Sequence, residues 1–320
     1  MSAHPTANST EEAFRSVDPL GEALHALRLS GTFFCRSEMS APWGIDLPPM
    51  PDSLMFHIMT EGSGWITFAN GERIQMETGD FALVPQGRGH AIVDAPETHA
   101  INLFDYDRPL LSPRYELLKI DGDGEQASLI CGVGSVKDPA ARRMVSLLPK
   151  IIPMRAATPG NEWLRGSVKI MMEEARSLGP GGDAVITRFS DILVVQSIRH
   201  WLNTDPNAQT GWLGALQDPQ VGRALALIHR DPTHPWTVEA LAGAVGVSRS
   251  GLAARFADLV GETPMTYLRQ WRFEVARNWL RDTDQTLAEI GEQLGYESEA
   301  SFSRAFKKAT GKTPGSVRRE

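Results

Sequence analysis

The sequence predicts a multi-domain protein with an N-terminal β-barrel, a middle helical element and a C-terminal all-α domain that contains two helix-turn-helix units. Three observations support this fold class. Apolar residues alternate with period two in short runs between Thr32 and Val136, and the period changes to 3.6 between Asp138 and Thr204. In the last hundred residues a helix-turn-helix pattern then occurs twice, about fifty positions apart.

Residues 1–17 are expected to form a disordered lead, because MSAHPTANSTEEAF is polar and acidic. The same stretch has neither the basic start nor the apolar segment of a signal peptide. Between Pro19 and Leu29, leucines recur at helical spacing and predict a short helix. We therefore expect the first folded domain to span residues 18–137.

The period-two region of this domain consists of short runs bounded by turn residues, which is typical of a β-barrel or sandwich. The runs are GTFFCR, LMFHIM, WITFA, ERIQM, FALVP, HAIVD, HAINLF, YELLKI and ASLICGVG. Asn70 and Gly71 stand between WITFA and ERIQM, and Asn-Gly is the two-residue sequence most typical of a β-hairpin. The sequence thus predicts a barrel of many short strands.

Amphipathic helices are predicted over residues 138–204. One of them has a side made of Leu164, Val168, Met171, Met172 and Ala175, and the next has a side, apolar except for Gln196, made of Phe189, Ile192, Leu193, Gln196 and Trp201. Such faces need an apolar partner, so this element either joins two copies of the chain or covers the mouth of the barrel. The polar stretches DPNAQTG and QDPQ then predict a linker over residues 205–219.

The C-terminal domain, residues 220–320, contains the two helix-turn-helix units, expected at about 237–260 and 286–309. In the first unit, Leu241 and Val245 stand four apart on one helix face, and Gly246 follows where a left-handed residue is needed. Ser248 is then placed to cap the next helix. The matching positions of the second unit are Ile290, Leu294, Gly295 and Ser298. The helix that connects the units carries Tyr267, Trp271, Val275 and Trp279 at a spacing of four.

From about Gln217 to Glu320 the chain resembles the DNA-binding domain of the AraC/XylS family of bacterial transcription regulators, and GYESEASFSRAFKKATGKTP is the most specific part of the match. The resemblance implies that the second helix of each unit enters the major groove of DNA. Carried over by position, the DNA-binding residues are Ser250, Gly251, Ala253 and Ala254 in the first unit, and Glu299, Ala300, Ser301, Ser303 and Arg304 in the second. Three nearby cations, Arg249, Lys307 and Lys308, are added as DNA-binding candidates because of their charge.

The two expected recognition helices differ in chemistry. Ala253 and Ala254 stand where family members often carry long polar side chains, so we expect the first helix to depend on phosphate contacts and DNA shape. Arg304 is the candidate for a base contact in the second helix, because arginine to guanine is the commonest specific pairing. The alternative is a surface arginine that holds a phosphate or a neighbouring acid. The role of Glu299 stays open.

Net charge does not decide whether the chain binds DNA. The whole chain carries −7, and from Gln217 onward 14 basic residues face 13 acidic ones. Placement is more informative, because the basic residues gather at the C-terminal end, as a nucleic-acid footprint does. This cluster comprises Arg304, Lys307, Lys308, Lys312, Arg318 and Arg319.

The segment GDFALVPQGRGHAIVD resembles the second conserved motif of the cupin superfamily, in which the histidine at the position of His90 is a metal ligand. The first cupin motif is incomplete here, since only His57 and Glu61 stand in its place. A divalent metal would need three ligands, such as His57, His90 and His99, brought together by the strands. The favoured interpretation is a core or pocket histidine without a metal cofactor.

Two further features concern a signal received by the barrel. We expect an effector pocket lined by Trp43, Phe56, His57, Trp65 and His90, with ordinary core aromatics as the alternative. Cys35 and Cys131 fall on the first and last predicted strands, where they are either buried free thiols or a redox switch. The WG…P, FHxMTxGxGW and LICG pieces resemble the cupin subset of AraC-like regulators, some of which sense oxidants.

These features together predict a cytoplasmic, homodimeric transcription regulator, with activation the commoner sign in the family. Its expected partners are double-stranded DNA, a second copy, RNA polymerase and a small-molecule effector, and no membrane, because no apolar stretch is long enough to span one. The rival is a metal-dependent cupin enzyme with a DNA-binding tail. We expect no enzyme, since the sequence contains no catalytic triad, phosphate-binding loop or dinucleotide fingerprint.

Overall fold

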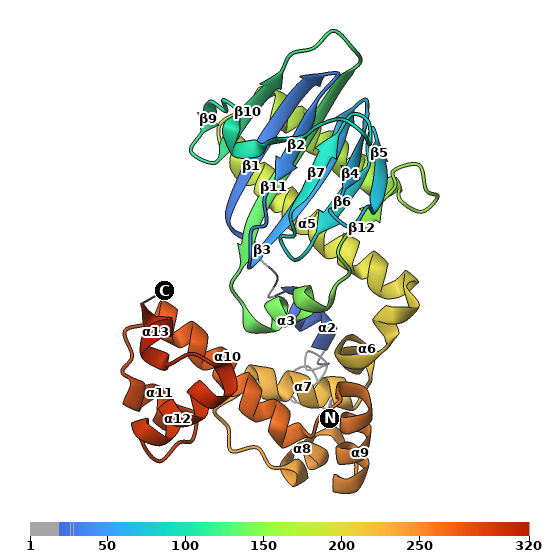
Figure 1. Ribbon diagram of the computed structural model, residues 1–320. Helices are drawn as coiled ribbons and strands as arrows, with labels where there is room; N and C mark the ends of the chain where they lie inside the picture. The colour runs from blue at the N-terminus through green and yellow to red at the C-terminus, as the bar shows by residue number, and fades with distance from the viewer. Residues whose placement is uncertain (1–18, 26, 28, 320) are drawn as a thin grey trace, which may run out of the picture. The chain divides into compact units, whose positions relative to one another are not determined.

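The computed structural model describes residues 19–25, 27 and 29–319 (Figure 1). The disordered lead expected over residues 1–17 lies outside the described residues. The chain divides into two compact units, one formed by residues 27–204 and the other by the segment before residue 27 together with residues 205–320. The first is built mainly of strands and the second of helices, which confirms the predicted fold class. Among the described residues no helix combines the length and the apolar character needed to span a membrane.

The first unit contains two sheets that face one another. The seven-stranded sheet has the order β12-β6-β3-β11-β1-β10-β9, and the five-stranded sheet has the order β5-β4-β7-β2-β8. The strands of the larger sheet are β1 (Leu29–Ser40), β3 (Ser53–Glu61), β6 (Phe81–Val84), β9 (Leu110–Ser112), β10 (Tyr115–Ile120), β11 (Gln126–Val136) and β12 (Ile152–Met154). Those of the smaller sheet are β2 (Gly44–Leu47), β4 (Ser63–Thr67), β5 (Arg73–Glu77), β7 (His90–Val93) and β8 (Ile101–Asn102), and the short 3-10 helix η1 (Leu103–Asp105) follows. The predicted hairpin joins β4 to β5, with Gly71 in the left-handed region at φ 85°.

Alternation along the strands divides the apolar residues of the larger sheet between two cores. Inward-facing side chains such as Met39, Met55 and Leu129 meet Ile66 and Ile92 of the smaller sheet. On the opposite face the rings of Phe34, Phe56 and Phe81 lie side by side, with centroids 6.2 and 5.7 Å apart. Gly132 leaves room for the ring of Phe56, because a Cβ on residue 132 would lie 2.2 Å from that ring. The outer face therefore also carries apolar rings that need a cover.

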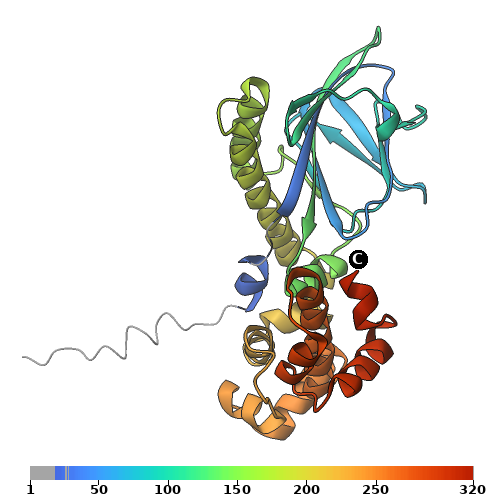
Figure 2. The same ribbon diagram turned by 90° about the vertical axis from the view of Figure 1, so that its left-hand side faces the viewer.

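Helices α4 (Glu162–Ser177) and α5 (Gly182–Thr204) provide this cover, and Figure 2 shows them in yellow-green along one face of the sheets. Tyr115 on β10 donates a hydrogen bond to the carbonyl oxygen of Ala175 on α4 at 3.3 Å. The predicted stripe of α4 is buried at Leu164, Val168, Met171 and Ala175. On α5, however, Ile192 is 47% exposed while its neighbour Leu193 is buried, because successive helical residues point about 100° apart.

Three strands, β2, β9 and β12, and one helix end differ from the prediction. The segment GIDL forms β2, which the period-two pattern did not single out. Helix α3 (Pro139–Leu147) stops before Pro149, which cannot continue a helix. Ile152 and Met154, expected to extend that helical region, instead lie in β12 and pair with β6.

The second unit is all helical. Its elements are α2 (Pro19–His25), the short 3-10 helix η2 (Pro206–Gln209), α6 (Gly211–Gln217), α7 (Val221–Arg230), α8 (Val238–Val245), α9 (Arg249–Val260), α10 (Pro264–Asp282), α11 (Leu287–Gln293), α12 (Glu299–Thr310) and α13 (Pro314–Arg318). Helix α10 runs between the two helix-turn-helix units and packs on α9 as well as on α11, α12 and α13.

The boundaries of this unit differ from the predicted ones. The segment 205–219, expected as a linker, contains η2 and α6, and Trp212, Leu213 and Leu216 of α6 are buried. Trp212 donates a hydrogen bond through Nε1 to the hydroxyl of Tyr267 at 2.9 Å. Helix α2, expected within the barrel domain, packs on α6 and α7. In the sequence these apolar stretches are short and flanked by polar loop residues, so they give no clear helical pattern.

Candidate nucleic-acid interface and sensing site

The first helix-turn-helix unit consists of α8, a turn at Gly246 and α9. Gly246 ends α8 in the left-handed conformation at φ 75°, and the Ser248 hydroxyl accepts a hydrogen bond from the backbone N–H of Gly251. Leu252 and Phe256 are buried on the inner side of α9. The outer side is thereby fixed, and it exposes Ser250, Gly251 and Ala254, while Ala253 is half-buried.

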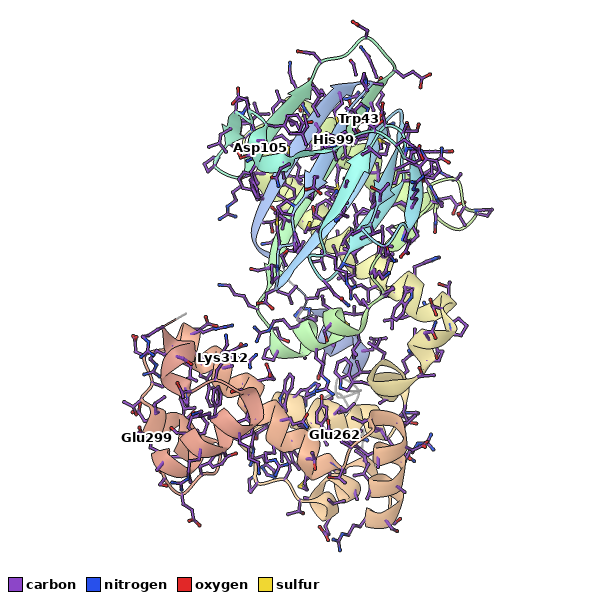
Figure 3. The ribbon with its side chains drawn as sticks, in the orientation of Figure 1. Trp43, His99, Asp105, Glu262, Glu299 and Lys312 are labelled. Carbon is purple, nitrogen blue, oxygen red and sulfur yellow. The ribbon has the colours of Figure 1, made fainter. Side chains whose placement is uncertain are left out.

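The second unit repeats this construction with α11, a turn at Gly295 and α12. Thr286 and Glu289 form a capping box at the start of α11, and Ser298 caps α12. Phe302 and Phe306 bury the inner side of α12. Its outer side exposes Glu299, Ala300, Arg304, Lys307 and Lys308. In Figure 3 the labelled Glu299 lies at the outer edge of this unit.

Ser301 and Arg249, both predicted to bind DNA, already have partners in the protein. The Ser301 hydroxyl donates to the carbonyl oxygen of Ser298 at 2.7 Å and accepts from the Ser298 N–H, which makes it part of the helix cap. Arg249 forms an ion pair with Glu239 of α8 at 2.8 Å, although both side chains are mostly exposed. A phosphate would therefore have to compete with Glu239 for Arg249.

Basic side chains on α10 and α12 differ in whether they have a partner in the protein. Arg304, Lys307 and Lys308 are exposed and form no ion pair or hydrogen bond within the described part of the chain. Arg272 instead donates to the carbonyl oxygens of Pro232 at 2.7 Å and His234 at 3.0 Å, and burial lowers its pKa. Arg304, Lys307 and Lys308 therefore remain exposed on α12, whereas Arg272 holds a loop in place.

In the sheet unit, residues 27–204, three candidate sensing residues form one row across the larger sheet. Cys35 on β1 pairs directly with Cys131 on β11, and Cys131 pairs directly with His57 on β3. His90 approaches from β7 of the opposite sheet, with its Nε2 2.8 Å from the Nε2 of His57. The Nδ1 of His57 lies 3.1 Å from the Cys131 Sγ, and the Nδ1 of His90 lies 2.7 Å from the carbonyl oxygen of Arg88.

One placement of protons satisfies this buried chain. The Arg88 carbonyl only accepts, so His90 donates through Nδ1 and accepts through Nε2. His57 then donates through Nε2 to His90 and accepts at Nδ1 from the thiol of Cys131. Both imidazoles are neutral, in agreement with burial, which lowers the pKa of each, that of His57 to well below its usual range.

The two thiols are held in their protonated form. Burial raises the pKa of Cys131 well above its usual value, and the neighbouring Cys35 adds to this effect. Burial likewise raises the pKa of Cys35 to about 11. Because the thiolate is the reactive form of cysteine, neither thiol is activated in this state.

The five residues expected to line one effector pocket do not share a side of the sheets. Trp43, His57 and His90 are buried between the sheets. Phe56 directly precedes His57 and lies on the opposite face of the sheet, where it packs against Phe34. Trp65 points away from the core that its neighbour Ile66 enters. The prediction is wrong for Phe56 and Trp65, because adjacent strand residues face opposite sides.

The proposed set of three metal-binding histidines is not assembled either. His99 is exposed in the segment before β8, and Figure 3 labels it with Trp43 in the sheet unit. His57 already uses both ring nitrogens, for Cys131 and His90. Among the described residues no three His, Cys, Asp or Glu side chains converge on a point that a metal ion could occupy. The residues present therefore do not fit a cupin metal centre.

A groove of about 350 Å³ lies on the outer face of the larger sheet, beside the C-terminal end of α4. Arg36 spans it, donating to the carbonyl oxygen of Ala175 at 2.8 Å and pairing with Glu38 at 3.0 Å. Ile130 and Met172 add apolar surface. Sequence reasoning missed this groove, because its walls come from strands and a helix that are far apart in the chain.

Two family models match the chain, one described as a cupin over residues 18–203 and one described as a helix-turn-helix domain over residues 241–320. An AraC-like transcription regulator of Streptomyces lividans is 32% identical over 305 residues, which cover 95% of this chain and 98% of the relative. The HTH-type transcriptional regulator AlkR of Acinetobacter baylyi is 28% identical, over 95% of this chain and 100% of the relative. The RCS-specific HTH-type transcriptional activator RclR of Escherichia coli is 27% identical, over 83% of this chain and 84% of the relative.

The two units and the comparisons define a class, that of transcription regulators that bind DNA through paired helix-turn-helix units and carry a sheet domain for sensing. Within this class the chain belongs to the AraC-like regulators with an N-terminal cupin domain.

Proposed function

We propose that the chain is a cytoplasmic, homodimeric transcription activator in which a signal at residues 27–204 changes how the recognition helices engage DNA and thereby RNA polymerase. The observation that carries this proposal is the outer side of α12, where Arg304, Lys307 and Lys308 are exposed and have no protein partner within the described residues. An exposed set of cations on a helix with a rigid inner side suits the major groove. The name of the Escherichia coli relative supports activation.

The two helices then have different tasks. Arg304 contacts a base edge, and Lys307 and Lys308 neutralise phosphates beside it. On α9 the small residues Ser250, Gly251, Ala253 and Ala254 allow a close approach and leave recognition to shape and backbone contacts. Ala300 and Ser303 line the approach of α12, and Glu299 limits which bases it accepts.

The test is a footprint on a duplex that the wild-type chain selects from a random pool. Arg304→Ala is expected to weaken binding to this duplex about ten- to a hundredfold, while binding to a scrambled duplex changes little. Arg114→Ala, which removes the same charge from an exposed turn of the sheet unit, serves as control. An equal loss of affinity for both duplexes would mean that Arg304 contacts only the phosphate backbone.

Dimerisation is proposed through the outer side of α4 and α5. Ile170, Val185 and Ile192 are exposed there by 45, 37 and 47%, although the inner sides of the same helices already cover the sheet. The two roles that the sequence left open, cover and dimer contact, thus belong to opposite sides of one helical pair. No enzymatic role is proposed, and within the described part of the chain no assembled ligand set supports the rival of a metal-dependent cupin enzyme.

The signal is proposed to be a small molecule, and the groove beside α4 has a volume suited to one. Oxidation of Cys35 and Cys131 is the second candidate, favoured by their direct pairing across β1 and β11. If oxidation of the thiols is the signal, Cys131→Ser should abolish the response to an oxidant such as hypochlorous acid while DNA binding is retained. The protonated state of both thiols favours the small molecule.

A further inference from the structure

Arg255 on α9 holds the carboxylate of Asp218 rather than pointing into solvent. Its Nε lies 2.8 Å and its Nη2 2.5 Å from the same oxygen, Oδ2 of Asp218. The Asp218 side chain is only 7% exposed, whereas that of Arg255 is 54% exposed. The pair therefore joins a buried acid to the surface of a recognition helix.

Asp218 also binds the start of α7, so it forms a junction between helices. Its other oxygen, Oδ1, accepts hydrogen bonds from the backbone N–H groups of Gln220 at 3.0 Å and Val221 at 2.9 Å, at the start of α7. Asp218 also directly follows the last residue of α6. Burial alone would raise its pKa, but Arg255 and these two N–H groups together hold the pKa below its usual value. One carboxylate thus connects α6, α7 and α9.

The location of this junction matters because α9 offers few contacts of its own to DNA. Ala253 and Ala254 cannot reach across a gap, so recognition by α9 depends on where its backbone lies. Leu252 and Phe256 hold the inner side of the helix, and Arg255 fixes its rotation on the flank that faces α6 and α7. A misplacement of about an ångström would separate backbone and phosphate beyond hydrogen-bonding distance.

We propose that Arg255 is a positioning residue for DNA recognition, which fixes α9 through Asp218 and makes no contact with DNA itself. Arg255 is a guanidinium beside a recognition helix, so the obvious alternative is a phosphate contact. The two roles predict opposite signs for a change at Asp218.

The experiment uses the full chain and the duplex selected by the wild-type protein, with Arg255→Met, Asp218→Asn and the double variant. Asparagine keeps an oxygen for the N–H groups of Gln220 and Val221 but loses the charge that holds Arg255. Each single variant is expected to weaken specific binding about three- to tenfold. The double variant should bind no more weakly than the single variant with the lower affinity, because the two residues act as one pair. Footprints should lose protection at the half-site of the first unit and keep it at the other.

The dependence on salt separates positioning from contact. A phosphate contact by Arg255 would make Asp218→Asn bind more tightly, since a negative charge is lost and the guanidinium is released, and Arg255→Met would lower the salt slope by about 0.9. Either result overturns the proposal, as does unchanged specific binding in Asp218→Asn. Positioning predicts weaker binding at an unchanged slope. Should Asp218→Asn unfold, Arg255→Met decides alone through its slope and footprint, because its side chain lies at the surface.

Discussion

His57 illustrates how a single buried residue sets the behaviour of its neighbourhood. It joins the thiol of Cys131 to His90 and through His90 to the carbonyl of Arg88, and the four groups satisfy one another only while both imidazoles are neutral. A proton added to either ring would leave two donors facing each other inside the barrel. Such fully satisfied networks are costly to disturb, because the interior offers no replacement partner.

The sheet unit should therefore lose stability in mild acid. The pKa values of His57 and His90 are lowered in the folded chain, so the unfolded chain binds more protons once the pH falls below about 6.5. The stabilisation is present above this pH and is lost progressively below it, by at most about 2 kcal/mol per histidine between pH 7 and 5.

Hydrogen exchange of the β3 and β11 amides at pH 7, 6 and 5 measures this effect. In His57→Gln the loss between pH 7 and 5 should be smaller than in the wild type, because only His90 still titrates. An identical loss in wild type and variant would mean that the buried pair does not control acid stability.

At the scale of the element, α5 shows one helix serving two surfaces. Its buried side, with Leu193 and Ile198, covers the larger sheet, while Ile192 and Val185 stand exposed on the other side. An exposed apolar stripe on a helix is a common site of association between proteins. The helical pair is thus suited to cover the sheet and to join a second copy at the same time.

A charge on this stripe should weaken the proposed dimer. Ile192→Glu is expected to raise the dimer dissociation constant at least about tenfold, because a carboxylate would be buried without a partner. Ala69→Glu places the same charge in an exposed turn of the sheet unit, away from the helical pair, and should leave association unchanged. Sedimentation velocity over a concentration series measures both, and equal dimerisation of the two variants would exclude this face as the contact.

At the scale of the whole molecule, the chain crosses between its two units more than once. Helix α2 belongs with the helical unit, the next strand with the sheet unit, and residues 205–320 with the helical unit again. Helix α6 completes the DNA-binding unit, since Trp212 reaches Tyr267 of α10 and Asp218 reaches Arg255 of α9. The functional boundary therefore lies before α6.

This boundary predicts how fragments behave. A fragment of residues 205–320 should fold and prefer the selected duplex, whereas one that begins at residue 218 should be less stable by roughly 3 kcal/mol or more, because it loses the buried side chains of Trp212, Leu213 and Leu216. Thermal unfolding of the two fragments tests this. Equal stability would show that α6 contributes nothing to the unit.

The sequence by itself determined the class of each unit and the parts of the reader that depend on local chemistry. The paired glycines at Gly246 and Gly295, the caps at Ser248 and Ser298 and the apolar inner sides of α9 and α12 are local signals, since each acts within one or two turns of chain. The hairpin at Gly71 is of the same kind.

Only the tertiary structure decided which side chains meet across the fold. The register of β1, β11 and β3 joins Cys35, Cys131 and His57 in one row, and the same alternation removes Phe56 and Trp65 from the pocket they were expected to line. Packing also assigns Arg255 to Asp218 and Arg272 to a loop. The physical reason is that hydrogen bonds and burial depend on distance in space, and partners separated by 20 to 100 positions leave no periodic signal along the chain.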